Sequence, residues 1–204
     1  MTILHISDTH GLHNQLTNLP SADVIVHSGD FTFGGSEKEA IDFMQWFCDL
    51  PYKHRVFVVG NHDMCMYGAE KIEGLPDNVH YLCNSSVVID GVKFYGMPMF
   101  MENVIDGTYD TIIKNIPDDT DVLVTHQPPY GILDSGEYHG QKDYHYGDYL
   151  LYAKVIDVKP MLHLFGHDHN TYGSEERFGT IFSNAAVVDE HYKLKKLEYL
   201  TYRI

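Results

Sequence analysis

Side chains of the kinds that bind metal ions follow short apolar runs at five places in this chain. Carboxylate, amide and imidazole groups form mixed nitrogen and oxygen sites, which suit Mn, Fe or Zn better than Mg or Ca. The pattern therefore predicts a transition-metal centre. The five sets are Asp8-Thr9-His10 after Ile3–Ile6, Gly29-Asp30 after Val24–Val26, Gly60-Asn61-His62-Asp63 after Val56–Val59, His126 after Val122–Val124, and Gly166-His167-Asp168-His169 after Leu162–Phe165.

The recurrence of these sets distinguishes them from ordinary turns. Asp, Asn and Gly are common in any turn that follows a strand, so a single set would be weak support for a metal site. Turn chemistry does not account for five histidines at these places. Asp, Asn and His also form strands poorly, which makes their repeated placement at strand ends informative. The recurrence favours one shared metal site.

The apolar runs themselves predict the elements that position these side chains. A short apolar run bounded by Gly and turn residues indicates a buried strand. Strands of an α/β sheet present their carboxyl ends to one crevice, where such sheets bind ligands. If the five strands lie side by side, two Asp, one Asn and up to five His converge on one point.

The remaining pattern predicts a single mixed α/β domain over residues 1–204. A capping box, Ser36-x-x-Glu39, opens a helix that stops at Leu50-Pro51. Asp90-Gly91 is a two-residue hairpin signal, and its antiparallel pair makes the sheet system mixed. The other expected elements are strands at Ser86–Ile89, Val92–Tyr95, Thr180–Ser183 and Leu197–Ile204 and a helix at Gly147–Val158.

Composition restricts the partners. The formal charge of −15 disfavours a nucleic-acid partner, whereas two bound cations would reverse the sign locally for a small phosphate ester. Three cysteines without a C-x-x-C pair fit a reducing compartment. With neither a signal-like start nor an apolar run of about 20 residues, we expect a cytoplasmic protein with no membrane partner. The sequence leaves the oligomeric state open.

The five sets, in order from Asp8 to His169, resemble the signature blocks of calcineurin-like metallophosphoesterases. Ser7-Asp8-Thr9-His10-Gly11 and the stretch His126–Gly131 look most like the small MPPED-type branch of that superfamily. The resemblance implies a four-layer α/β/β/α sandwich with mixed sheets and a metal site at the sheet edges.

The resemblance also implies roles for the residues of the five sets. Two divalent transition-metal ions are expected, with Mn favoured and Fe or Zn as alternatives, and Asp30 is expected to bridge them. His62 would stand near the leaving group as general acid, with Asp63 holding its ring. By the family pattern one metal takes Asp8, His10, Asp30 and His169, and the other takes Asp30, Asn61, His126 and His167.

Two such metals would turn a bridging water into a hydroxide that attacks a phosphate ester, and would neutralise its charge. Protein Ser/Thr phosphatases of the superfamily carry an Asp-Arg pair after the Gly-Asp block, whereas Gly29–Gly35 contains no Arg. This departure favours a small-molecule phosphodiester, with a cyclic nucleotide as one candidate. A phosphomonoesterase and a nucleotide- or metal-binding protein with little turnover stay as alternatives. A nuclease is a third, against which the net charge counts.

The segment Gln127–Tyr146 is rich in Pro, Gly, Tyr and His. Loops of this length without regular structure are uncommon unless they are functional or disordered. We expect Tyr130 and His139 to bind substrate together with Asn61 and His62. The alternative is that this loop only covers the end of the sheet.

Overall fold

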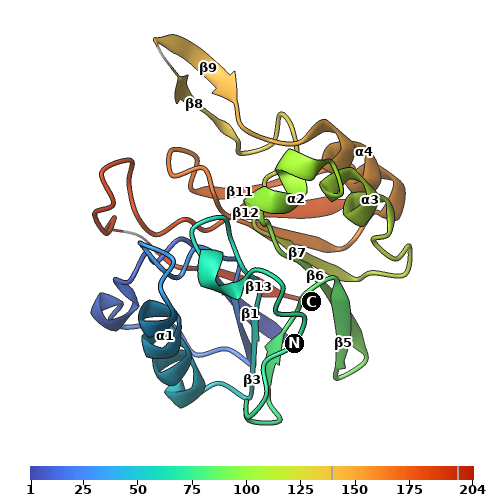
Figure 1. The fold of residues 1–204 in the computed structure, drawn as a ribbon. Helices are drawn as coiled ribbons and strands as arrows, with labels where there is room; N and C mark the ends of the chain where they lie inside the picture. Colours follow the sequence, from blue (N-terminus) through green and yellow to red (C-terminus); the bar gives the residue numbers. More distant parts are fainter. Residues whose placement is uncertain (139, 197) are drawn as a thin grey trace.

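The computed structural model describes residues 1–138, 140–196 and 198–204. Its backbone contains two large sheets (Figure 1). The first has the strand order β13-β1-β2-β3-β4. Its first four strands in the chain run parallel, and the last strand of the chain pairs antiparallel with β1 at the edge. The bounds are β1 Thr2–Ile6, β2 Val24–His27, β3 His54–Phe57, β4 Val79–Tyr81 and β13 Leu200–Arg203.

The second sheet has the order β11-β12-β10-β7-β6-β5. Its four inner strands are parallel, and β5 and β11 pair antiparallel at the two edges. The hairpin predicted at Asp90-Gly91 joins β5 to β6, with φ of 48° and 86° at the two turn residues. The bounds are β5 Ser85–Ile89, β6 Val92–Met97, β7 Val122–Thr125, β10 Leu162–Phe165, β11 Gly173–Arg177 and β12 Thr180–Asn184.

Helices cover the outer faces of both sheets. On the first sheet lies α1 (Glu37–Asp49), which opens with the predicted capping box between Ser36 and Glu39. On the second lie α3 (Tyr109–Lys114) and α4 (Tyr149–Val158), and Asp148 caps α4 through the backbone N–H of Leu151. The short elements are α2 Met101–Asp106, η1 His13–Gln15 and η2 Met64–Met66.

Three buried clusters separate four layers, which confirms the predicted α/β/β/α sandwich with mixed sheets. Because alternate residues of a strand face opposite sides, Ile3 packs between the sheets while Leu4 packs under α1. The cluster under α1 includes Phe43, Phe47 and Phe57, the cluster between the sheets includes Val24, Val56, Phe94, Val122 and Leu164, and the third includes Leu123, Leu151, Val155 and Phe182.

Two expectations need correction. The five strands that precede the ligand sets do not form one sheet, because β1, β2 and β3 belong to the first and β7 and β10 to the second. Their ends meet across the sheet pair, where His167 N, after β10, donates to Asp8 Oδ1, after β1, at 3.1 Å. The segment Gln127–Tyr146 is not without regular structure, because Ser135–Tyr138 (β8) and Gln141–His145 (β9) pair as a projecting hairpin (Figure 1). Pairing satisfies backbone groups that a long loop would leave to solvent.

His139, expected to bind substrate, lies outside the described residues. Among the helices that the structure describes, none has both the length and the apolar character that a bilayer crossing requires.

Candidate metal centre

The predicted ligands lie in turns that bend sharply at the ends of the strands. Asp8, His10, Asp30 and His167 have φ of 54°, 41°, 57° and 71°, in the left-handed region that side chains other than glycine rarely adopt. Such strain of about 1–3 kcal/mol per residue persists where the surroundings determine the conformation, and it gathers at functional sites. The turns bring together side chains from both sheets.

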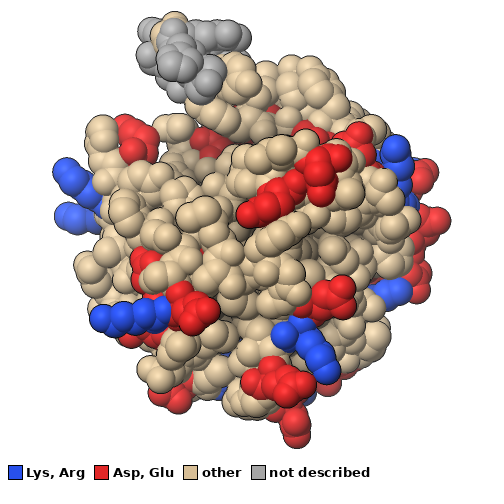
Figure 2. All heavy atoms as spheres, viewed as in Figure 1, with Lys and Arg blue, Asp and Glu red and all other residues tan. Residues whose placement is uncertain are grey.

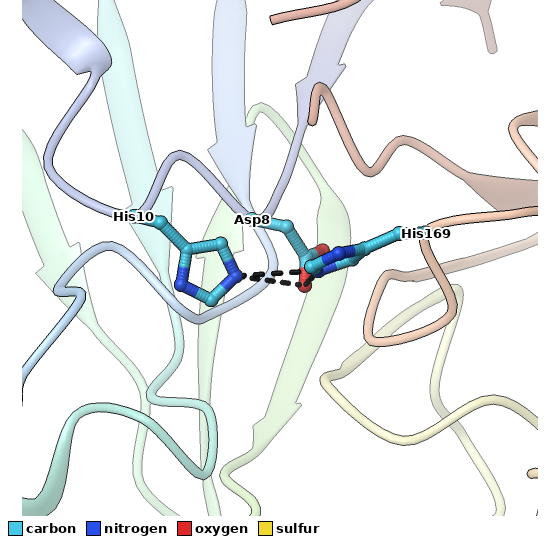
Figure 3. Close-up of side chains that lie close together, drawn as sticks. All are labelled: Asp8, His10 and His169. Carbon is cyan, nitrogen blue, oxygen red and sulfur yellow. Dashed lines mark hydrogen bonds and ion pairs between the residues drawn. The ribbon is translucent and has the colours of Figure 1, made fainter. Parts of the chain in front are cut away.

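The first cluster consists of Asp8, His10 and His169, whose side chains point toward one another (Figure 3). His169 Nε2 lies 3.3 Å from Asp8 Oδ1, and His10 Nε2 lies 3.9 Å from the same oxygen. The two Nε2 atoms are 3.2 Å apart. Asp8 and His10 are buried, so these atoms face one another with little water between them.

The second cluster consists of Asp30, His126 and His167, with Asn61 beside them. His126 Nε2 is 3.2 Å from Asp30 Oδ2. Asn61 Oδ1 lies 3.1 Å from that nitrogen and 2.9 Å from His167 Nδ1. Asp30 Oδ2 is also 3.8 Å from His10 Nε2, so this carboxylate stands between the two clusters, where the sequence pattern places a bridging ligand.

Backbone carbonyl groups hold three of these imidazoles. His10 Nδ1 donates to Thr32 O at 3.1 Å, His126 Nδ1 to Ser28 O at 2.9 Å and His169 Nδ1 to Asp189 O at 3.1 Å. Because a carbonyl oxygen only accepts, Nδ1 carries the proton, and Nε2 of each neutral ring presents a lone pair to the site. Lone pairs this close together need a cation or a proton between them. The donor set thus fits divalent transition-metal ions.

Hydrogen bonds and charge keep the two carboxylates ionised. Asp8 accepts from His167 N at 3.1 Å, and Asp30 Oδ1 accepts from His62 N at 2.8 Å. Burial raises the pKa of both groups, but the neighbouring histidines outweigh it, His169 for Asp8 and His126 for Asp30, so both pKa values are lowered. For His126, burial lowers the pKa, while Asp30, Asp8 and the Ser28 carbonyl together more than offset this and raise it to about 9.

Two glycines of the sequence pattern allow the close approach of these loops. A Cβ at Gly166 would collide with the Asp8 carboxylate and the Ser7 side chain. A Cβ at Gly60 would collide with Asp30, whose backbone nitrogen would lie at 2.6 Å. No side chain fits at either position without displacing a carboxylate of the site.

His62 and Asp63 do not form the expected pair. The Asp63 carboxylate accepts hydrogen bonds from the backbone N–H groups of Gly60, Asp30 and Thr32 at 2.8–2.9 Å. His62 Nδ1 donates to Phe33 O at 3.0 Å instead. Burial and the Asp30 charge raise the pKa of Asp63 to about 7. Asp63 thus holds together the turn that contains Asp30 and the turn that begins at Gly60. The carbonyl oxygen of Phe33 orients the His62 ring toward His10 and Asp30.

A pocket of about 260 Å³ opens above the clusters. Asn61 and His62 line it, as expected for substrate-binding residues. Tyr130 does not, because its ring stacks on Tyr149 of α4 at a centroid distance of 3.6 Å. The other described lining residues are Asp30, Tyr146, His167, Asp168, His169, Asn170, Glu190 and Tyr192.

Four of these lining residues lie outside the five sets and are not among the site residues predicted from the sequence. Glu190 and Tyr192 follow the last ligand set by about 20 residues and belong to no ligand-type set. Asn170 adjoins His169, and Tyr146 ends the segment that was expected to bind substrate. Of these four, only Tyr146 and Asn170 could have been found, by their position next to predicted site segments.

Lys195 binds the backbone beside the predicted ligand His169. Its Nζ donates to the backbone oxygen of His169 at 2.5 Å and to that of Ala186 at 3.0 Å. The side chain also lies over the ring of Tyr172, 5.6 Å from its centroid. These contacts fix the loop that carries His169.

The sandwich and its paired carboxylate and histidine clusters define a metal-binding hydrolase site. The sequence profile of calcineurin-like phosphoesterases matches residues 1–171, and this chain belongs to that family. The family uses divalent metals to hydrolyse phosphoric esters, and the clusters described above supply ligands for them.

Relatives support the same assignment. A UPF0046 protein of Caenorhabditis elegans is 35% identical over 211 residues, 91% of this chain and 69% of the relative. Metallophosphoesterase domain-containing protein 1 of Homo sapiens is 29% identical over 222 residues, 92% of this chain and 66% of the relative, which confirms the resemblance to the MPPED-type branch. A crystal structure with 15% identity shares the fold at a TM-score of 0.59, covering 90% of this chain and 89% of the other.

Proposed function

We propose that this chain is a phosphodiesterase that holds two divalent transition-metal ions, with Mn favoured over Fe or Zn, and hydrolyses a small diester. A cyclic nucleotide is one candidate substrate. Asp8, His10 and His169 would hold one ion, and Asn61, His126 and His167 the other. Asp30 would contact both. When bound, such ions lower the pKa of a water molecule and neutralise charge on phosphoryl oxygens.

The protein side chains supply the remaining steps. Asn61 lines the pocket beside the ligands and can orient the ester by its amide. His62 would donate a proton from Nε2 to the leaving oxygen, because its Nδ1 is already committed to Phe33 O.

The proposed preference for diesters rests on the residues that line the pocket. Of the ten described residues that line it, none is Lys or Arg, and Asp168 and Glu190 add negative charge. A dianionic monoester gains most from an added cationic side chain, whereas a monoanionic diester gains least. The face of the molecule drawn in Figure 2 shows acidic side chains in several groups and fewer basic ones, and the net charge of −15 also disfavours a long polyanion.

The test compares a diester with a monoester at equal metal loading. After reconstitution with Mn, kcat/KM for bis-nitrophenyl phosphate should exceed that for nitrophenyl phosphate, and elemental analysis should give two ions per chain. A preference for the monoester would make the chain a phosphomonoesterase. Binding of nucleotide without turnover under the same conditions would make it a binding protein.

We further propose that residues 1–204 act as one domain in the cytoplasm. Cys48, Cys65 and Cys83 are all unpaired, which fits a reducing compartment.

A further inference from the structure

A tyrosine that belongs to no ligand set, Tyr192, lies beside the first metal cluster. Its ring centroid is 4.8 Å from that of His10 and 5.3 Å from that of His169, and each pair of rings is nearly perpendicular, at 88°. Phe33 packs against it at 5.2 Å. Tyr192 also lines the pocket together with His62 and Asn61. Its ring is thus placed by two predicted ligands and one aromatic neighbour.

The backbone around Tyr192 is held in an unusual conformation. Its φ is 58°, which is rare for a bulky side chain and costs about 1–3 kcal/mol. Asp189 holds the turn: its carboxylate accepts from the backbone N–H groups of His191 and Lys193, both at 2.9 Å. Its carbonyl accepts from Tyr192 N at 2.9 Å and from His169 Nδ1 at 3.1 Å. One turn therefore orients a predicted ligand and places Tyr192 beside it.

The hydroxyl of Tyr192 is available to a ligand. Within residues 1–138, 140–196 and 198–204, no group makes a hydrogen bond with it. A phenol has a pKa of about 10 and is a hydrogen-bond donor at neutral pH. Because the described lining of the pocket has no Lys or Arg, neutral donors are what it can offer to a phosphate oxygen beyond the ions and His62.

We propose that the Tyr192 hydroxyl donates a hydrogen bond to a non-bridging oxygen of the phosphoryl group held at the metal centre. This assignment rests on the proposed function and extends it, because a neutral hydrogen-bond donor suits a monoanionic diester. Tyr192 lies beyond residue 171, where the match to the family profile ends. The competing role is a purely apolar wall made by the ring.

The substitution Tyr192→Phe separates these roles, because it removes the hydroxyl and keeps the ring between His10, His169 and Phe33. Tyr67→Phe is the matched control: Tyr67 is also partly exposed, at 48%, packs on Phe100 and does not line the pocket. For each protein loaded with Mn, calorimetry gives the dissociation constant for inorganic phosphate, elemental analysis the metal content, and a thermal melt the stability.

Tyr192→Phe should weaken phosphate binding about tenfold and lower kcat/KM for bis-nitrophenyl phosphate by a similar factor, because a hydrogen bond to a charged group is worth about that much. Metal content and melting temperature should equal those of the wild type, and Tyr67→Phe should match the wild type throughout. Tyr192→Ala should bind phosphate no better than Tyr192→Phe.

Wild-type phosphate affinity in Tyr192→Phe, with weaker binding only in Tyr192→Ala, would assign the effect to the ring and overturn the proposal. Loss of metal in Tyr192→Phe would also overturn it, because the residue would then act through His169. If the wild type binds phosphate in a Tyr192-dependent way but hydrolyses no ester, this assignment stands and the proposed phosphodiesterase function fails.

Discussion

The predicted metal ligands and five other residues that line the pocket are built in different ways. The ligands, called the floor here, are Asp8, His10, Asp30, Asn61, His126, His167 and His169, and the rim consists of His62, Tyr146, Asn170, Glu190 and Tyr192. Floor residues follow buried strands, and hydrogen bonds to the backbone fix most of their side chains. Rim residues come from loops, and all five are at least partly exposed.

This difference suggests that metal binding and substrate turnover can be separated by mutation. Changes in the floor should alter how many ions the protein holds. Changes in the rim should alter catalysis and leave the metal content unchanged. Asp63 belongs to neither group. Its carboxylate binds the backbone of the turns, so its substitution should affect stability rather than metal binding or catalysis directly.

The largest effect is expected from Asp30→Asn in the floor. Breaking a buried charge pair costs about 3–5 kcal/mol, which corresponds to a fall of about 10³-fold in metal affinity. Because Asp30 Oδ2 faces both His126 and His10, both sites should lose metal and activity should fall to background. Elemental analysis after gel filtration measures this. His169→Ala is the control and should weaken mainly one site; two ions retained in Asp30→Asn would exclude a shared carboxylate.

His62→Ala tests the rim. Positioned proton transfer is worth ~10²–10⁴-fold, and a poor leaving group needs it most. The substitution should cost much of that range on alkyl or nucleoside esters and markedly less on nitrophenyl esters, with metal content unchanged. Steady-state kinetics on both ester types measures the difference. Equal losses would remove His62 from the acid role, and loss of metal would place it in the floor, since it offers a ligand atom near His10 and Asp30.

Asp63→Asn should act on stability. An amide nitrogen would face backbone N–H donors, and leaving such a buried donor unsatisfied costs about 1–3 kcal/mol. For a chain of this size a loss of about 2 kcal/mol lowers the melting temperature by about 4–8 °C. Thermal unfolding in the presence of chelator measures it. Any loss of activity should be the same for good and poor leaving groups; a bias like that of His62→Ala would restore Asp63 to a role in proton transfer.

The smallest effect is the release of protons on metal binding. The pKa of His126 is raised to about 9 in the metal-free protein, so this ring carries an extra proton near neutral pH. A histidine must lose that proton to bind a metal ion, so affinity should rise with pH up to about 9. Calorimetric titration of Mn in two buffers of different ionisation enthalpy should show at least one proton released near neutral pH. No release would mean either that His126 does not bind the metal or that its ring is already neutral in the metal-free protein.

Much of the floor could be predicted because its signals are local. A short apolar run indicates a buried strand, and the residues after it are read directly from the chain. Asp8, Asp30 and His126 were found in this way. The role that the family resemblance implies for Asp63, to hold the ring of its neighbour His62, does not match the structure, because successive residues point in different directions. Its carboxylate instead reaches the backbone near Asp30 and Thr32, about 30 positions earlier in the chain.

The sequence by itself determined which side chains end the strands and therefore the chemistry of the floor. Only the tertiary structure decided that the strands divide between two sheets, which brings His167 N to Asp8 across 159 positions. It also decided the rim, where Tyr192 stands beside His10 because the turn held by Asp189 closes on His169. Strand formation follows from the pattern of neighbouring residues, whereas these contacts depend on how distant segments pack, and no short stretch of sequence encodes that packing.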